Sequence, residues 1–198
     1  MSLRFAYTAL APFYDAIVSR ASVQARRVSI AALPVDGCQR ILLSGVGTGL
    51  DLPLLPTNHG YVALDLTRAM LERAFPRKGT LDITWVQGDS QALPFGDAVF
   101  DHAVLHLILA VVPDSVGALR ETARVVKPGG SLYILDKFLR PGQRAPLRRA
   151  LNPLARRIAT RTDVVFEDVL AQAPRLTVAS DDAAAFGGWF RCIRLVRI

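Results

Sequence analysis

Cysteine is scarce in this chain, and long hydrophobic runs are missing. The two cysteines, Cys38 and Cys192, lie far apart and fit no Cys-x-x-Cys or Cys/His spacing, so we predict neither a metal site nor a disulfide framework. We expect both to be reduced thiols of a cytoplasmic protein. The longest apolar run, residues 103–112, falls far short of the roughly 20 residues that a membrane-spanning helix requires. No long apolar segment follows the first basic residue, Arg4, so we expect no secretory signal.

Acidic residues are missing from one stretch, residues 137–161, which carries eight basic residues. The rest of the chain holds 16 basic residues against 17 acidic ones, so the net charge of +7 originates in this stretch. Its arginines flank an apolar stripe that includes Leu147 and Leu151, a pattern compatible with peripheral contact with an anionic membrane at its inner face. A solvated helix face is the plain alternative. Nucleic acid is disfavoured because no aromatic residue interleaves the arginines.

Alternation of short apolar runs with helical segments is the main fold signal. The 198 residues, 51% of them hydrophobic, are enough for one globular domain. The expected strands are 40–44, 61–65, 83–87, 99–105 and 131–136, followed by 176–179 and 189–196. The expected helices are 3–18, 21–33, a short one in 50–55, 67–74, 113–126, 140–160 and 166–173. The last two strands are too close for a crossover helix and should form an antiparallel hairpin. We therefore predict a doubly wound, mostly parallel, seven-stranded α/β sheet with helices on both faces.

Three glycines at alternate positions, Gly45, Gly47 and Gly49, follow the first expected strand. Such a turn lets backbone lie against a ligand. Asp65 ends the second strand, 20 residues after Gly45, where a carboxylate can accept hydrogen bonds from both hydroxyls of a ribose. Asp89 ends the third strand and is a candidate acceptor for an adenine amino group. The plain alternatives are a helix cap for Asp65 and an ion pair with an arginine for Asp89.

Two classes of nucleotide cofactor fit this pattern. The dinucleotide fingerprint of an NAD-dependent dehydrogenase requires G-x-G-x-x-G, but here the third glycine comes one residue early, at Gly49. The helix that should receive a pyrophosphate is also short and contains Pro53. Both features favour a nucleoside without a diphosphate, namely S-adenosylmethionine.

Four segments in order carry a resemblance to class I S-adenosylmethionine-dependent methyltransferases, which have a Rossmann-like fold. These segments are LLSGVGTG (42–49), VALDLTRAML (62–71), QGDSQALPFGDAVFD (87–101) and ARVVKPGGSLYILD (123–136). Within this superfamily the chain is most similar to the group of quinone-ring C-methyltransferases and bacterial phospholipid N-methyltransferases. That closer likeness rests on residues 11–15, 93–95 and 188–191.

The resemblance implies S-adenosylmethionine as methyl donor, S-adenosylhomocysteine as product, and a set of cofactor-binding residues. These residues are Ser44, Gly45, Val46, Gly47, Gly49, Asp65, Leu66, Asp89, Ser90 and Leu105. Tyr14 would belong to an N-terminal helical lid (1–36) over a Rossmann-like core (40–198). One position departs from the family. An acid often stands two residues before the first glycine, and this chain has Leu43 there, which would weaken contact with the methionine amino group.

Methyl transfer from a sulfonium is a direct displacement, so positioning matters more than acid–base apparatus. His106, just past the fourth strand, is the candidate base for the acceptor's surplus proton, although its neighbours are apolar. The other candidates have structural interpretations: His102 as an interior side chain, Asp101 as a structural acid, and His59 as a surface-loop residue. The expected acceptor is a phospholipid headgroup amine, a quinone-type ring or a soluble metabolite. A binding or regulatory protein without catalysis is the competing class.

Overall fold

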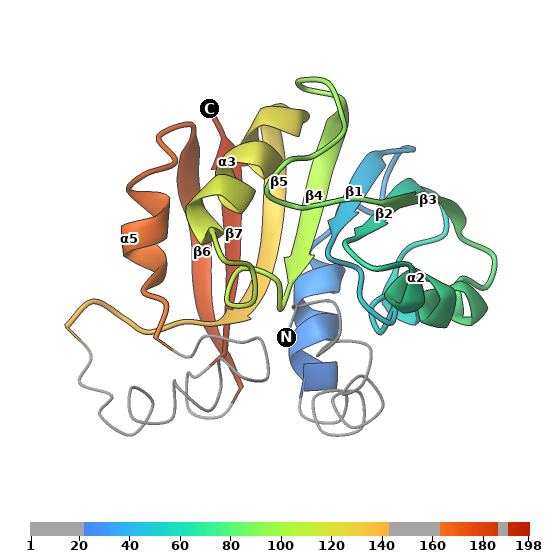
Figure 1. Ribbon diagram of the computed structural model, residues 1–198, viewed down its shortest axis with the longest axis horizontal. Helices are drawn as coiled ribbons and strands as arrows, with labels where there is room; N and C mark the ends of the chain where they lie inside the picture. The colour runs from blue at the N-terminus through green and yellow to red at the C-terminus, as the bar shows by residue number, and fades with distance from the viewer. Residues whose placement is uncertain (1–21, 143–162, 186–189) are drawn as a thin grey trace.

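A seven-stranded sheet forms the centre of the computed structural model, with helices on both faces (Figure 1). The structure describes residues 22–142, 163–185 and 190–198. The expected helix at 3–18 lies outside these ranges, as does the expected helix at 140–160 from residue 143 onward. None of the helices in the described part of the chain combines the length and apolarity needed to cross a membrane.

The strand order places the ligand-binding edge of the sheet. The strands are β1 (Arg40–Ser44), β2 (Gly60–Asp65), β3 (Asp82–Gln87), β4 (Phe100–His106), β5 (Val126–Lys137), β6 (Leu176–Ala185) and β7 (Phe190–Arg197). They lie in the order β3-β2-β1-β4-β5-β7-β6. Strands β1 to β5 pair in parallel, and β7 is antiparallel to both of its neighbours. This topology confirms the predicted fold class, and it puts the switch in strand order between β1 and β4.

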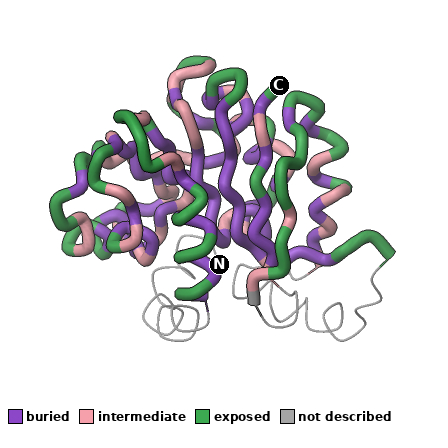
Figure 2. Tube along the Cα trace, turned by 180° about the vertical axis from the view of Figure 1, so that it is seen from behind, coloured by how far each residue is buried: buried purple, intermediate pink, exposed green. Residues whose placement is uncertain are grey.

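Two hydrophobic cores cover the two faces of the sheet. The helices are 22–31, α2 (Arg68–Ala74), α3 (Ser115–Val125) and α5 (Phe166–Leu170), with 3-10 turns η1 (Leu52–Leu54) and η2 (Phe75–Arg77). Leu42 packs in the core under α3 and α5, whereas Leu43 faces the core under helix 22–31, η1 and α2, because successive strand residues point to opposite faces. Buried residues follow the central strands (Figure 2).

Two strands, β5 and β6, extend several residues beyond their expected bounds. Strand β5 already pairs at Val126, opposite Phe100, before a register irregularity. Strand β6 continues past residue 179 to Ala185. In this extension Arg191 on β7 donates hydrogen bonds to both oxygens of the Asp181 carboxylate. A cross-strand ion pair thus stabilises an acid that single-sequence patterns place in a turn.

Candidate functional site

The glycine turn follows β1 at the carboxyl edge of the sheet. Gly45, Gly47 and Gly49 all have positive φ (73°, 56° and 79°). A Cβ on Gly45 would lie 2.7 Å from Ile108 Cδ1, and one on Gly49 would lie 2.9 Å from Ala74 Cβ. A Cβ on Gly47 would meet no atom within 4 Å. Packing therefore explains the first and third glycines, and the space above Gly47 is the part of the turn that is open to a ligand.

Asp65, at the carboxyl end of β2, connects the glycine turn to the start of α2. Its Oδ2 accepts a hydrogen bond from the Gly47 backbone N–H (2.9 Å), and its Oδ1 accepts one from the Thr67 N–H (3.0 Å). Burial raises the pKa of Asp65, although these hydrogen bonds act in the opposite direction. The helix cap considered as an alternative is present only in part, because Asp65 bonds the N–H of Thr67, which is itself the N-cap residue of α2. Because an ionised carboxylate has about four acceptor sites, the ribose role is compatible with it.

Asp89 and Ser90 follow β3. Asp89 accepts hydrogen bonds from the Gln91 backbone N–H (2.9 Å) and side-chain Nε2 (3.0 Å) rather than from an arginine of the described chain. Ser90 accepts a hydrogen bond from Ser44 Oγ (2.9 Å), which joins the ends of β1 and β3 through buried hydroxyls. The residues expected at an adenine edge therefore lie beside the glycine turn.

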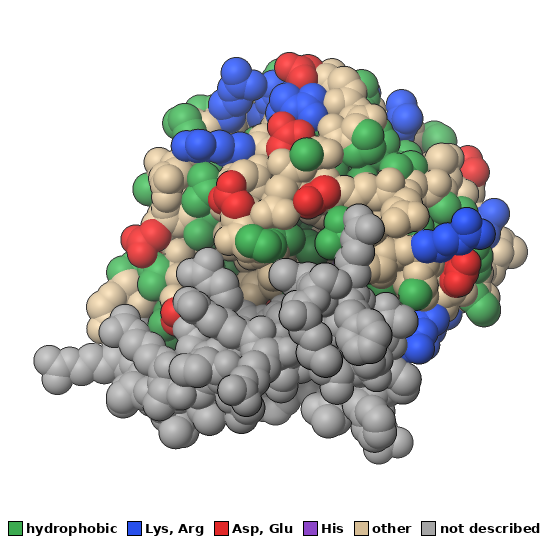
Figure 3. Space-filling model, in the orientation of Figure 1, with side chains coloured by type: hydrophobic (Ala, Val, Ile, Leu, Met, Phe, Trp, Pro, Cys, Tyr) green, Lys and Arg blue, Asp and Glu red, His purple; other side chains and the backbone are tan. Residues whose placement is uncertain are grey.

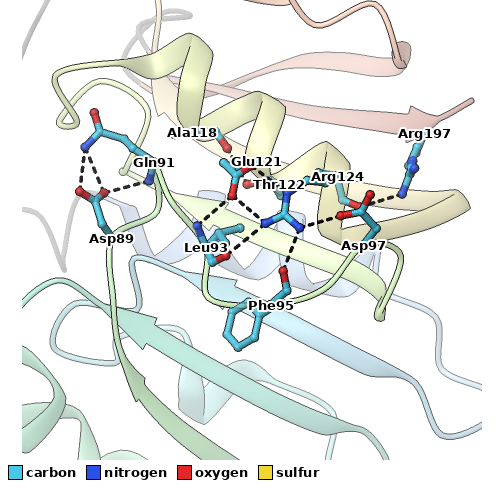
Figure 4. A network of polar contacts seen from close by, with 10 residues as sticks. All are labelled: Asp89, Gln91, Leu93, Phe95, Asp97, Ala118, Glu121, Thr122, Arg124 and Arg197. Atoms are coloured by element: carbon cyan, nitrogen blue, oxygen red, sulfur yellow. Dashed lines mark hydrogen bonds and ion pairs between the residues drawn. The ribbon is translucent and has the colours of Figure 1, made fainter.

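The loop after Asp89 is held by Arg124 on α3 (Figure 4). Arg124 donates hydrogen bonds to the Asp97 carboxylate (2.8 Å) and to the carbonyl oxygens of Leu93 (3.1 Å) and Phe95 (2.8 Å). It also donates to Glu121, and this hydrogen bond lowers the pKa of Glu121, which in turn accepts the Leu93 N–H (2.9 Å). This network could not be predicted from the sequence, since three of these contacts involve backbone groups, which leave no trace in residue type.

The end of β4 approaches the glycine turn from the other side. Leu105 is fully buried in the core, so only its backbone could face a cofactor. Leu107 has a φ of 60°, which is uncommon for a residue with a side chain and typical of strained functional turns. This turn brings Ile108 over Gly45.

His106 is buried, and both of its ring nitrogens have partners. Nε2 lies 2.8 Å from Ser29 Oγ, and Nδ1 lies 2.9 Å from Asp51 Oδ1. Asp51 also forms a buried ion pair with Arg26 (2.7 Å). The role of His106 as a base remains a prediction, and it would require the ring to give up one of these contacts. Arg26 and Asp51 are not among the site residues predicted from the sequence, although an acid two residues after Gly49 was an available signal.

The remaining candidates have clear positions. Asp101 accepts a hydrogen bond from the Arg40 N–H (2.8 Å) at the amino end of β4, which confirms its interpretation as a structural acid. His102 accepts a hydrogen bond from the Ser131 N–H (3.0 Å), as expected of a structural side chain, but it is half-buried rather than interior. The interpretation of His59 was wrong. His59 is only 2% exposed. Its ring accepts a hydrogen bond from the Gln39 N–H and bonds the Pro34 carbonyl oxygen, and these contacts join the segment before β1 to the loop before β2.

The other three expected site residues are Val46, Leu66 and Tyr14. Val46 is buried in the core under helix 22–31, and Leu66 is half-buried, with its carbonyl oxygen accepting a hydrogen bond from Gln87 Nε2 (3.2 Å). Tyr14 lies outside the described residues, as does the basic stretch from residue 143 onward. On the face shown in Figure 3, acidic and basic side chains of the described residues are interspersed.

Comparison with known proteins adds family information to this geometry. The family described as "Methyltransferase domain" matches residues 42–134. A phosphatidylethanolamine N-methyltransferase of Cereibacter sphaeroides is 32% identical over 93% of this chain and 92% of its own length. A demethylmenaquinone methyltransferase of Mycobacterium sp. (strain KMS) is 34% identical over 70% of this chain, which spans only 61% of that relative.

Solved structures share the fold at lower sequence identity. A SAM-dependent methyltransferase from Thermotoga maritima superposes with a TM-score of 0.74 at 18% identity, covering 100% of both chains. A structure from Haloferax volcanii, of a complex between the Trm112 methyltransferase activator and a methyltransferase, gives a TM-score of 0.80 at 20% identity, covering 96% of this chain and 97% of the matched one. At these identities the likeness concerns the fold alone.

Proposed function

The chain belongs to the class I S-adenosylmethionine-dependent methyltransferases, and we propose that its methyl acceptor is the amine of a phospholipid headgroup. The observation that carries the proposal is the match to the Cereibacter sphaeroides phosphatidylethanolamine N-methyltransferase, which extends over nearly the whole length of both chains. The mycobacterial relatives named for demethylmenaquinone are longer than this chain. A quinone-type ring is therefore the second candidate.

The residues around the glycine turn fit the proposed cofactor. Open space lies above Gly47, and an acceptor carboxylate, Asp65, lies at the end of the neighbouring strand. S-adenosylmethionine, when bound, supplies an electrophilic methyl group on its sulfonium. In the proposed arrangement Gly47 admits the nucleoside against the backbone, Asp65 accepts hydrogen bonds from the ribose hydroxyls, and Asp89 with Ser90 binds the adenine edge.

Alanine at two glycines should separate cofactor binding from folding. Gly47→Ala places a methyl group in open space, so we expect a modest loss of stability, about 1–2 kcal/mol for the positive φ, and at least about a tenfold loss of affinity for S-adenosylhomocysteine. Gly49→Ala adds a clash with Ala74 and should cost about 2–5 kcal/mol of stability. Calorimetric titration and thermal melts measure the two effects. Wild-type affinity in Gly47→Ala would show that the cofactor lies elsewhere.

The acceptor can be tested with labelled methyl groups. The wild-type protein is incubated with methyl-labelled S-adenosylmethionine and vesicles that contain either phosphatidylethanolamine or a demethylated quinone. We expect label in the headgroup amine, identified by mass spectrometry of the extracted lipid. Label in the quinone ring, or in neither lipid, would contradict the proposed acceptor.

Residues 137–161 are the proposed contact with the membrane that presents this acceptor. Lys137 and Arg140 are the basic residues of this stretch within the described chain. Positive charge beside an anionic bilayer is attracted by about 1 kcal/mol per side chain, and salt screens this attraction. In the vesicle experiment, methylation should therefore be faster with anionic vesicles than with neutral ones and should slow as salt is added.

A further inference from the structure

A buried polar cluster lies beside the glycine turn, between the sheet and helix 22–31. It consists of Arg26 and Ser29 from the helix, Asp51 from the residues after Gly49, and His106 from the end of β4. Each is at most 7% exposed. Buried ions are costly, so a cluster of this kind demands an explanation beyond packing.

The contacts of the cluster converge on one carboxylate oxygen. Asp51 Oδ1 lies 2.7 Å from Arg26 Nη1 and 2.9 Å from His106 Nδ1. Ser29 bonds the far side of the imidazole, and Arg26 Nε donates a hydrogen bond to Ser22 Oγ (3.0 Å). Burial acts to raise the pKa of Asp51, but the interactions with His106 and Arg26 outweigh it and hold that pKa well below its usual range. Asp51 is therefore an anion throughout the physiological pH range.

The second oxygen of this carboxylate is available. Asp51 Oδ2 accepts no hydrogen bond from the described residues, and Arg26 Nη2 donates none to them, while the Asp51 side chain retains 10% exposure. The pair thus presents one unused acceptor on an anion and one unused donor on a cation. This arrangement complements a zwitterion, whose ammonium needs the acceptor and whose carboxylate needs the donor.

The cluster lies on the same face of the sheet as Leu43, the uncharged residue of β1 at the position where the family often has an acid. Leu43 pairs with Val104 in the β1–β4 register. Because side chains alternate between faces, His106, two residues after Val104, lies on the same face as Leu43. The carboxylate that His106 holds therefore lies at the same edge of the sheet as the uncharged Leu43.

We propose that the Arg26–Asp51 pair binds the zwitterionic amino-acid end of the cofactor, with Asp51 receiving the ammonium and Arg26 the carboxylate. His106 and Ser29 are positioning residues that fix the Asp51 carboxylate. The inference rests on the proposed binding of S-adenosylmethionine at the glycine turn. It assigns the contact that Leu43 cannot make to a residue eight positions later in the chain.

Two ligands that differ at this end test the assignment by calorimetry. S-adenosylhomocysteine carries the amino-acid end, and 5′-methylthioadenosine lacks it but keeps the nucleoside. Asp51→Asn should weaken binding of the first by about tenfold or more and leave binding of the second within about twofold. Asp101→Asn, at the opposite edge of the sheet, is the matched control and should change neither affinity. Equal losses for both ligands, or no loss for either, would overturn the proposal.

Removal of one buried charge can also unfold the chain, so a second variant is needed. Arg26→Gln/Asp51→Asn removes both charges and leaves no unpaired ion, and it should show the same selective loss. If neither variant retains the wild-type circular dichroism, a crystal structure of the wild type with S-adenosylhomocysteine decides. The ammonium nitrogen should then lie within about 3.2 Å of an Asp51 oxygen, and a position beyond contact overturns the proposal. Failure of the wild type to bind either ligand would instead refute the proposed cofactor.

Discussion

Asp65→Asn should weaken binding of S-adenosylhomocysteine by about 100-fold, because an amide replaces the carboxylate that accepts hydrogen bonds from the ribose. Hydrogen bonds to a charged group contribute about 1.5–3 kcal/mol each, and the amide oxygen of Asn can keep one of the two, so the loss of the other converts to an effect of about this size. The same carboxylate accepts the Gly47 N–H and so shapes the turn on which the cofactor would lie. Calorimetric titration of the wild type and the variant measures the change.

A control separates this role from the helix-start role of Asp65. Asp82→Asn changes an exposed acid at the amino end of β3, away from the turn, and should leave the affinity unchanged. If Asp65 served only to accept the Thr67 N–H, Asp65→Asn would lower the melting temperature while the affinity stayed at the wild-type value. That result would remove Asp65 from the cofactor site.

The pH dependence of binding should carry the signature of the same carboxylate. Burial raises the pKa of Asp65 above its ordinary value of 3.8. As the pH falls through this raised pKa, Asp65 gains a proton and loses acceptor capacity, so the affinity should begin to fall at a higher pH than an ordinary aspartate would cause. The contribution of Asp65 to folding has the opposite sign, because protonation relieves the cost of a buried charge. Asp65→Asn should abolish this acid limb of the affinity profile.

Arg191→Leu should destabilise the chain by about 1.5–3 kcal/mol, because it removes the hydrogen bonds that a buried guanidinium donates to two partly exposed carboxylates. The Arg191 side chain is 1% exposed. Its Nη2 lies 2.7 Å from Glu167 Oε1, and its Nε lies 3.0 Å from Asp181 Oδ1. The guanidinium also lies 5.5 Å from the centre of the Phe166 ring. One side chain thereby joins β7, β6 and α5.

The measurement for Arg191 is denaturant unfolding at neutral pH. Arg194→Leu, on the same strand but exposed, is the control and should change the unfolding free energy by less than about 0.5 kcal/mol. The hydrogen bonds from Arg191 lower the pKa of Asp181, so this pair stabilises the fold above pH 3.8, and its contribution is lost as the pH falls through the lowered pKa. A loss below 1 kcal/mol in Arg191→Leu at neutral pH would contradict the role given to this ion pair.

Much of the fold could be predicted because its signals are local. The strand at Arg40–Ser44 was predicted with its observed bounds, since a short apolar run ends at a glycine turn there. The hairpin of β6 and β7 followed from a connection too short for a helix. The extent of β6 could not be predicted, because the ion pair that holds Asp181 in the strand is formed with Arg191, ten residues away.

The candidate site divides in the same way. Asp65 and Asp89 were predicted because carboxyl ends of parallel strands meet at one edge, and their positions could be counted from the glycines. Asp51 and Arg26 were missed because their contact joins residues 25 positions apart and depends on how helix 22–31 packs. His59 shows the same limit, since a loop position gave no sign that the ring bonds two backbone groups.

Titration of the wild-type protein with S-adenosylhomocysteine in a calorimeter tests the central claim most directly. Binding at the glycine turn predicts saturable heat with one site per chain, and no saturable heat with NAD under the same conditions. An absence of saturable heat with S-adenosylhomocysteine would contradict the account of the turn, of Asp65 and of the proposed methyl transfer together.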